Sequence, residues 1–229
     1  MRSSGTYFAN VRAGLMASKA MTRAAALAAA LLLGASLSAG AAPETIRFAI
    51  MRNGEQIGTH TIEINRGAHE TTVTSATELV VKVLFVTAYH LQQTGSERWV
   101  NGRLVALATQ TDDNGTLHKV SVALKPAGLE VEADGKTSTV DKSMMPATLW
   151  NPEMMKRTSV LDPQDGQVVA IEVTDVGAEE LTLDAHTVKA RHFSIKGKFT
   201  QDVWYDEHGR LVQSSLVAPD NSIILYKPQ

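Results

Sequence analysis

The fold class follows from one stretch, residues 45–64, which reads Thr45-Ile46-Arg47-Phe48-Ala49-Ile50-Met51-Arg52-Asn53-Gly54-Glu55-Gln56-Ile57-Gly58-Thr59-His60-Thr61-Ile62-Glu63-Ile64. Its first half alternates, because Ile46, Phe48 and Ile50 point to one side and their neighbours to the other, as in a strand with one buried face. Asn53-Gly54 follows, the dipeptide most typical of a two-residue hairpin turn. The alternation then resumes, so the stretch predicts two antiparallel strands joined by a tight turn.

The same pattern of alternating strands and tight turns continues along the chain. The segments between turns are rich in Val, Ile, Thr, Tyr and Trp, and the turns recur at spacings typical of a sandwich or barrel. The predicted turns are Asn101-Gly102, Asn114-Gly115, Asp134-Gly135, Asp165-Gly166, Glu207-His208-Gly209 and Asp220-Asn221. We therefore expect an all-β fold: a curved antiparallel meander of ten to thirteen strands that forms an open or closed barrel.

Two segments break this pattern. Residues 79–86, Leu79-Val80-Val81-Lys82-Val83-Leu84-Phe85-Val86, are apolar on both sides. They predict a central strand, either packed on both faces or with one face on a ligand or partner. Residues 144–157 contain Asn151 as a helix N-cap, Pro152 as a first helical residue and Glu153 to complement the helix dipole. We expect one short helix near 152–158, lying across the sheet or plugging it.

The front end of the chain has the layout of a secretory signal peptide. Lys19 and Arg23 precede an apolar run at residues 24–33, and a small-residue segment ends at Ala41. Ten apolar residues are too few to span a bilayer, which takes about 20. We expect residues 1–41 to be removed, with Met1, Met16 or Met21 as the start, and residues 42–229 to form a single periplasmic or secreted bacterial domain.

Composition excludes several classes of partner and modification. The chain has no cysteine, so it carries neither a disulfide nor the lipid of a bacterial lipoprotein. Four of its 22 basic residues and none of its 24 acidic ones precede residue 42, which leaves residues 42–229 with a net charge of −6. Nucleic acid and anionic membranes are therefore poor partners. At 5% aromatic residues, the chain is too poor in aromatics for a membrane barrel, so we expect no integral membrane protein after cleavage.

Catalytic and metal-binding motifs are not evident. The sequence lacks H-E-x-x-H, G-x-S-x-G and the glycine-rich phosphate loops. The pairs Met144-Met145 and Met154-Met155 are the best metal lead, because thioethers select Cu(I), but methionines also fill irregular core gaps. The Asp-rich turns lack the spacing of a calcium loop. We expect no catalytic residue, no metal and no cofactor.

The two apolar segments that interrupt the strand pattern suggest that the protein binds a ligand. The two-faced segment 79–86 and the Trp150/Met segment predict a non-catalytic extracytoplasmic protein that binds an apolar or amphipathic, lipid-like small molecule. The candidate binding residues are Leu84, Val86, Tyr89, Trp99, Leu149, Trp150, Met154 and Met155. The alternatives are a structural or interaction module of the cell envelope with a filled core, and a hydrolase with an unrecognised site. The sequence does not indicate which oligomeric state the protein has.

Several short motifs, in order, resemble a family of secreted bacterial proteins known only as a domain of unknown function. They are Asn53-Gly54-x-x-Ile57-Gly58, residues 97–104 with 111–115, Trp150-Asn151, and Trp204-Tyr205-Asp206-x-x-Gly209-Arg210-Leu211-Val212. The resemblance implies a periplasmic or secreted β-rich domain without an assigned activity. It extends distantly, at the level of fold, to the open β-barrels of lipoprotein-localisation factors, which wrap a curved sheet around an apolar ligand.

Overall fold

The computed structural model describes residues 42–183, 186–198 and 200–229. The predicted signal peptide, residues 1–41, lies outside the described residues. The elements are β1 (Glu44–Arg52), β2 (Glu55–Arg66), β3 (Glu70–Val83), β4 (Val86–Val100), β5 (Arg103–Asp113), β6 (Thr116–Leu124), β7 (Leu129–Ala133), β8 (Lys136–Val140), the 3-10 helix η1 (Pro152–Lys156), β9 (Ser159–Leu161), β10 (Val168–Ala170), β11 (Glu172–Leu183), β12 (His186–Lys196), β13 (Gln201–Asp206), β14 (Leu211–Val217) and β15 (Ile223–Pro228).

Within the described residues, thirteen of these strands form one antiparallel sheet, in the order β11-β12-β13-β14-β15-β1-β2-β3-β4-β5-β6-β7-β8. The last strand of the chain, β15, pairs with the first, β1, in the middle of the sheet, from Phe48↔Pro228 to Arg52↔Ile224. The sheet ends in two unpaired edges, β8 and β11, so it is an open barrel rather than a closed one. The expected all-β antiparallel meander is thus confirmed.

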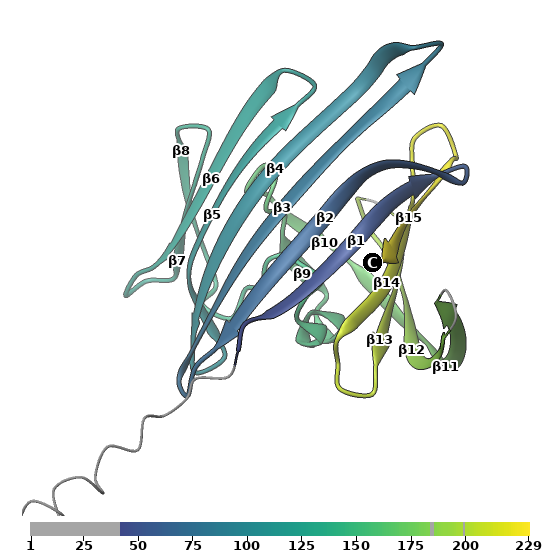
Figure 1. Ribbon diagram of the computed structural model, residues 1–229. Coiled ribbons are helices and arrows are strands. Elements are labelled where there is room, and N and C mark those ends of the chain that lie inside the picture. The colour runs from purple at the N-terminus through teal and green to yellow at the C-terminus, as the bar shows by residue number, and fades with distance from the viewer. Residues whose placement is uncertain (1–41, 184–185, 199) are drawn as a thin grey trace, which may run out of the picture. The chain divides into compact units, whose positions relative to one another are not determined.

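Residues 141–171, between β8 and β11, leave the sheet and lie on its concave side (Figure 1). We call them the insert. It contains η1 and the small hairpin β9–β10. The predicted helix is present as η1, where the Asn151 side chain accepts from the backbone N–H of Glu153 as an N-cap. It is a short 3-10 helix ending at Lys156, two residues before the expected end.

The prediction of one continuous strand over residues 79–86 is wrong. β3 ends at Val83, the chain turns at Leu84-Phe85, and β4 begins at Val86. Leu84 and Phe85 both take left-handed backbone conformations, with φ of 50° and 67°. Two-residue hairpin turns need such φ values and usually use Asn-Gly or Asp-Gly for them. The turn was missed because Leu and Phe are poor residues for that conformation.

Two apolar clusters lie on the concave face. The main cluster joins the inner side chains of the sheet, such as Phe48, Ile62 and Val73, to the insert. A smaller cluster is centred on Ile50, Leu79 and Ile224. Ile46, Phe48 and Ile50 are all buried as the alternation in the first strand predicted, but Ala49 between them is buried as well.

No helix in the described part of the chain has the length and hydropathy needed to cross a membrane.

Candidate ligand site on the concave face

The structure brings together five of the eight predicted ligand residues. Trp99, Leu149, Trp150, Met154 and Met155 all belong to the main cluster or pack against it. Tyr89 lies against the smaller cluster. Leu84 and Val86 are instead exposed at the tip of the β3–β4 hairpin, with 88% and 68% of their surfaces accessible. They do not join the others, because the segment turns back at Leu84-Phe85 rather than running on through the sheet.

A buried carboxyl group is central to the main cluster. Glu97 Oε2 accepts hydrogen bonds from Trp99 Nε1 at 2.7 Å and from Trp150 Nε1 at 3.0 Å. The two indole rings meet edge to face at 5.6 Å. Trp150 comes from the insert and Trp99 from β4, so Glu97 fastens the insert to the sheet.

The same burial changes the acid strength of Glu97. Removal from water penalises the charged form and raises the pKa of this carboxyl, and the hydrogen bonds from Trp150 and Trp99 oppose the shift. Burial is the larger effect, so the surroundings favour a neutral acid over a carboxylate. Glu97 can then both accept from the indoles and offer a proton to a neighbouring acceptor.

Above Glu97, polar side chains cross the concave face in a single row. The strand register aligns His60 with Thr77, Thr77 with Gln93, and Gln93 with Thr111. We call these four residues the polar row. Thr77 and Thr111 are 8% and 1% exposed, so the row lies inside the fold rather than on its surface.

The polar row is hydrogen-bonded in two pairs. His60 Nδ1 lies 2.7 Å from Thr77 Oγ1, and Gln93 Nε2 donates to Thr111 Oγ1 at 2.9 Å. Burial lowers the pKa of His60 to about 4, with a hydrogen bond from the ring to the backbone of Ala76 opposing the shift. His60 is therefore a neutral ring at physiological pH. It stacks on Phe48 and meets Tyr226 edge to face.

Two cavities open between this row and the insert. The first, of about 180 Å³, is lined by Glu97 and three members of the polar row among other residues, and the second, of about 260 Å³, lies beside it. They share six lining residues: Gln93, Ala147, Leu149, Pro163, Gln201 and Tyr226. The two cavities therefore adjoin.

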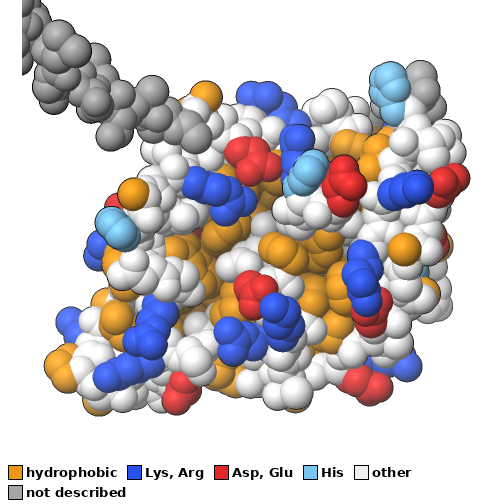
Figure 2. Space-filling view, turned by 90° about the horizontal axis from the view of Figure 1, so that it is seen from below, with side chains coloured by type: hydrophobic (Ala, Val, Ile, Leu, Met, Phe, Trp, Pro, Cys, Tyr) orange, Lys and Arg blue, Asp and Glu red, His pale blue; other side chains and the backbone are white. Residues whose placement is uncertain are grey.

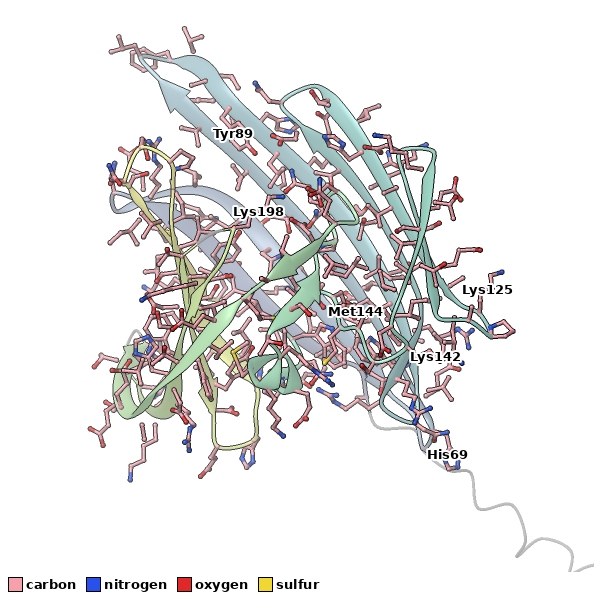
Figure 3. The ribbon with its side chains drawn as sticks, turned by 180° about the vertical axis from the view of Figure 1, so that it is seen from behind. His69, Tyr89, Lys125, Lys142, Met144 and Lys198 are labelled. Atoms are coloured by element: carbon pink, nitrogen blue, oxygen red, sulfur yellow. The ribbon has the colours of Figure 1, made fainter. Side chains whose placement is uncertain are left out.

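The concave face becomes apolar again above the polar row. Thr77 is followed on β3 by inward-facing Leu79 and Val81, which pair with Leu91 and Tyr89 of β4. These residues belong to or pack on the smaller cluster. Figure 3 shows the molecule from behind, with Tyr89 toward the upper end of the sheet and Met144 of the insert lower down. From bottom to top the face is apolar, polar and apolar.

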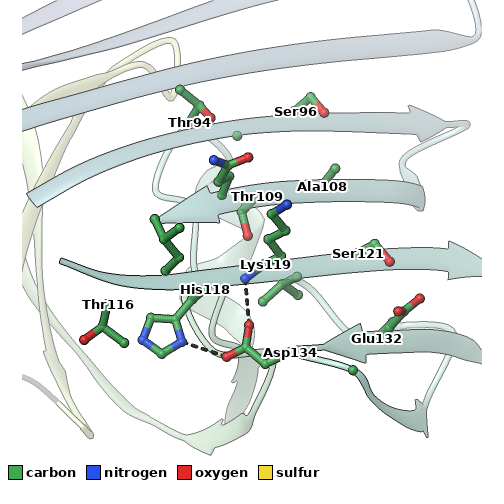
Figure 4. A pocket seen from close by; sticks show the side chains of 15 residues that line it. Thr94, Ser96, Ala108, Thr109, Thr116, His118, Lys119, Ser121, Glu132 and Asp134 are labelled. Atoms are coloured by element: carbon green, nitrogen blue, oxygen red, sulfur yellow. Dashed lines mark hydrogen bonds and ion pairs between the residues drawn. The ribbon is translucent and has the colours of Figure 1, made fainter. Parts of the chain in front are cut away.

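Two further hollows lie outside this interior. A groove of about 1060 Å³ runs over the outer side of β4–β7, and its floor is exposed Thr, Ser, Gln and Ala side chains, with His118 bonded to Asp134 at one end (Figure 4). It is open to solvent along its length. A pocket of about 570 Å³ lies at the lower end, beneath Trp150. Seen from below, apolar side chains show there between charged ones (Figure 2).

Arg66 is one of the charged residues that line the lower pocket, and its guanidinium lies 5.6 Å from the centre of the Trp150 ring. Both Arg66 and Arg210 face Glu44, at 3.5 and 3.4 Å. The acidic partner offsets the two cations, so this pocket is not a concentrated positive site.

The methionine pairs belong to the core. Met145, Met154 and Met155 are buried in the main cluster, and Arg157 Nε donates to Met145 Sδ. Among the described residues, no three His, Asp or Glu side chains are grouped to hold a metal ion.

The residues of this candidate site that the sequence analysis did not include are the polar row and Glu97. Their signal was present, since Ser75 and Thr77 interrupt an apolar inward pattern on β3, and Gln93 and Glu97 do so on β4. Only the pairing of four strands, β2 to β5, showed that these interruptions fall side by side.

Comparisons with known proteins agree with this architecture. Residues 48–229 match the model of DUF6134, a domain of unknown function. No curated protein matches the chain. Among solved structures, the chain is similar to a β-barrel-like protein of the domain of unknown function DUF1849 from Brucella abortus. The two share 11% sequence identity over 82% of this chain and 95% of that one, with a TM-score of 0.58. At this identity the likeness shows the fold alone.

Proposed function

The chain belongs to the DUF6134 family, and we propose that it is an extracytoplasmic, non-catalytic protein that binds a small amphipathic molecule on the concave face of its sheet. The polar end of the ligand contacts the polar row and Glu97. Its apolar part extends upward along the smaller cluster. The observation that carries this proposal is the order of levels on one face, with a cavity lined by polar groups below an apolar surface.

The chemistry of the site favours a neutral or hydrogen-bonding head group. His60 is held neutral and Glu97 is biased toward its neutral form, so no fixed positive charge of the polar row attracts an anion. Thr77 and Gln93 both donate and accept hydrogen bonds, and Glu97 does so in the protonated form that its burial favours. A hydroxyl, amide or protonated acid fits this set better than a phosphate.

The size of the interior limits the ligand. Each cavity is smaller than the roughly 300–1,000 Å³ of ordinary small-molecule pockets, at about 180 and 260 Å³. A ligand that occupies both therefore has a single narrow chain rather than several. A lipid with two or three acyl chains would require the insert to move.

The test is binding of a fluorescent single-chain fatty acid to the delipidated protein. Ser75 lines the smaller cavity, and Ser75→Leu fills it, so we expect at least a tenfold weaker affinity. Thr74→Leu, one residue earlier on the exposed outer face of β3, is the matched control and keeps wild-type affinity. Thermal unfolding of both variants checks that each is folded. Wild-type protein that binds no probe, or equal affinities for the two variants, would reject the site.

A second function has its own supporting observation. The insert fills the lower part of the concave face, where Met154, Val160 and Leu161 are 2% exposed or less. A packed interior is what a structural module of the cell envelope needs. Failure of the native protein to bind any single-chain probe would favour this alternative.

A further inference from the structure

The tip of the β3–β4 hairpin is the most exposed apolar feature among the described residues. Leu84, Phe85 and Val86 are 88%, 100% and 68% exposed. We call these three residues the apolar tip. The hairpin that carries them extends past the neighbouring hairpins of the same rim in Figure 1. No other part of the chain that the structure describes covers them, although each would gain from leaving water.

The turn itself is unfavourable for the residues that form it. Three other two-residue turns lie at the same rim of the sheet. They are formed by Asn53-Gly54, Asn114-Gly115 and Asp134-Gly135, which adopt positive φ at low cost. The β3–β4 turn has the same conformation with Leu84 and Phe85, which adopt it only with strain. Because these side chains are exposed, no burial within the fold offsets that strain. Backbone strain of this kind persists at functional sites.

We propose that the apolar tip inserts into the surface of a lipid bilayer. The tip is convex and only three residues wide, whereas a stable protein–protein interface buries about 800 Å² on each partner. A bilayer surface accepts a narrow apolar projection without a complementary pocket. Lys82, exposed next to the tip, has an aliphatic stem that follows apolar surface while its ammonium group stays at the head-group level.

Other residues of the same rim have the same character. Leu117, near the β5–β6 turn, is 61% exposed, and Ile223, at the start of β15 after the β14–β15 turn, is 60% exposed. Both strands begin at the rim from which the apolar tip projects (Figure 1). Insertion of the tip therefore brings further apolar side chains toward the membrane surface.

The charge of the chain determines which kind of membrane binding to expect. Residues 42–229 have a net charge of −6, so anionic lipids repel the protein as a whole. Binding through the tip is apolar, and we expect it on zwitterionic vesicles and with little dependence on salt. The inference stands on the tip alone and does not need a ligand in the cavity. Membrane binding through the tip would also bring the proposed site, which becomes apolar toward this rim, close to a source of amphipathic molecules.

The test uses flotation of the exported protein with vesicles of phosphatidylcholine and phosphatidylethanolamine. The double variant Leu84→Asn, Phe85→Gly installs the turn that the neighbouring hairpins use. We expect it to bind vesicles at least tenfold more weakly while unfolding at the same or a higher temperature, so misfolding cannot explain the loss. Leu124→Asn removes an exposed leucine at the opposite end of β6 and is the matched control, with unchanged binding.

A second measurement locates the contact. In Phe85→Trp, the new indole should be quenched by brominated lipids, whereas Trp99, Trp150 and Trp204 are at most 9% exposed and should not be. Lys125→Trp, in the β6–β7 loop at the opposite end of the sheet, is the control position. Unchanged flotation of the double variant, absence of quenching at position 85, or binding that requires anionic lipid and low salt would overturn the proposal. So would tip-dependent self-association without vesicle binding. Fatty-acid affinity is measured separately, so failure of the cavity site would not be mistaken for failure of the tip.

Discussion

At the scale of single residues, buried polar groups distinguish this sheet from a simple apolar trough. Glu97 joins β4 to the insert through two indoles, and His60 joins β2 to β3 through Thr77. Burial shifts the pKa of each group in the direction that favours its uncharged form. A buried polar group without a partner costs about 1–3 kcal/mol, so these hydrogen bonds fix which strands and insert residues face each other.

His60 should make the protein less stable in mild acid. Its pKa falls from 6.5 to about 4 in the folded protein. Between these pH values the unfolded chain binds a proton that the folded protein does not bind. The free energy of unfolding therefore decreases as the pH falls from 6.5 to 4, by about 3 kcal/mol in total. His60→Gln, neutral at every pH, should lose this part of the slope in urea unfolding measured at several pH values.

The matched control for this prediction is His69→Gln. His69 is exposed and should leave the slope unchanged. The raised pKa of Glu97 acts in the opposite direction, because the folded protein there binds the extra proton and loses stability as the pH rises. Both wild type and His60→Gln carry the Glu97 contribution, so it cancels when the slope of one is subtracted from that of the other. Identical slopes for wild type and His60→Gln would show that His60 is accessible to protons in the folded state.

At the scale of elements, the insert is fixed to both wings of the sheet. Lys198, between β12 and β13, binds Asp162 at 2.7 Å and Asp165 at 2.9 Å. On the other side Gln164 donates to Asp113 at the end of β5. Tyr205 of β13 donates to the backbone carbonyl of Leu149. The insert therefore bridges strands that are far apart in the sheet order, and it helps to set the curvature of an open sheet.

Gly166 tests how tightly the insert packs. It has a φ of +71°, and a Cβ built there would lie 2.7 Å from Cβ of Ala133 on β7. Gly115 also has a positive φ, but nothing lies within 4 Å of its would-be Cβ. Gly115→Ala should cost about 1 kcal/mol from backbone strain alone, whereas Gly166→Ala should cost more, because the clash adds to it. Urea unfolding of both variants measures the difference, and equal losses would mean that the insert is free to shift.

At the scale of the whole molecule, the open edges are polar. β8 is Lys136-Thr137-Ser138-Thr139-Val140 and is mostly exposed, and β11 is interrupted by a bulge between Asp175 and Gly177. Charged residues and bulges hinder the pairing of a free edge with another chain. An open barrel of this kind can keep its concave face accessible without joining its edges to a second copy.

Export remains a prediction from the sequence. The basic, apolar and small-residue order of residues 19–41 should direct cleavage after Ala41. N-terminal sequencing of protein taken from the periplasm should begin at Ala42, within two residues. Intact Met1 or Met21 on folded periplasmic protein would show that the segment is retained. Mass spectrometry of the same sample measures the mass of the cleaved chain and so checks the cleavage site independently.

The sequence by itself determined the all-β class, the hairpin turns and the position of the short helix η1. These features depend on local chemistry: a two-residue hydrophobic period, Asn-Gly and Asp-Gly turns, and an Asn-Pro helix start. It failed at Leu84-Phe85, because there the turn is formed by residues that local preference opposes. No local rule predicts a strained turn with exposed apolar side chains.

Only the tertiary structure decided which residues form a site. His60, Thr77, Gln93 and Thr111 lie on four strands, and a shift of one residue in any strand would turn its member to the outer face. Register is set by the whole sheet together with the insert that packs on it. The levels on the concave face, the cavities between them and the raised pKa of Glu97 depend on that register, because burial and neighbours are properties of the folded chain and not of the order of its residues.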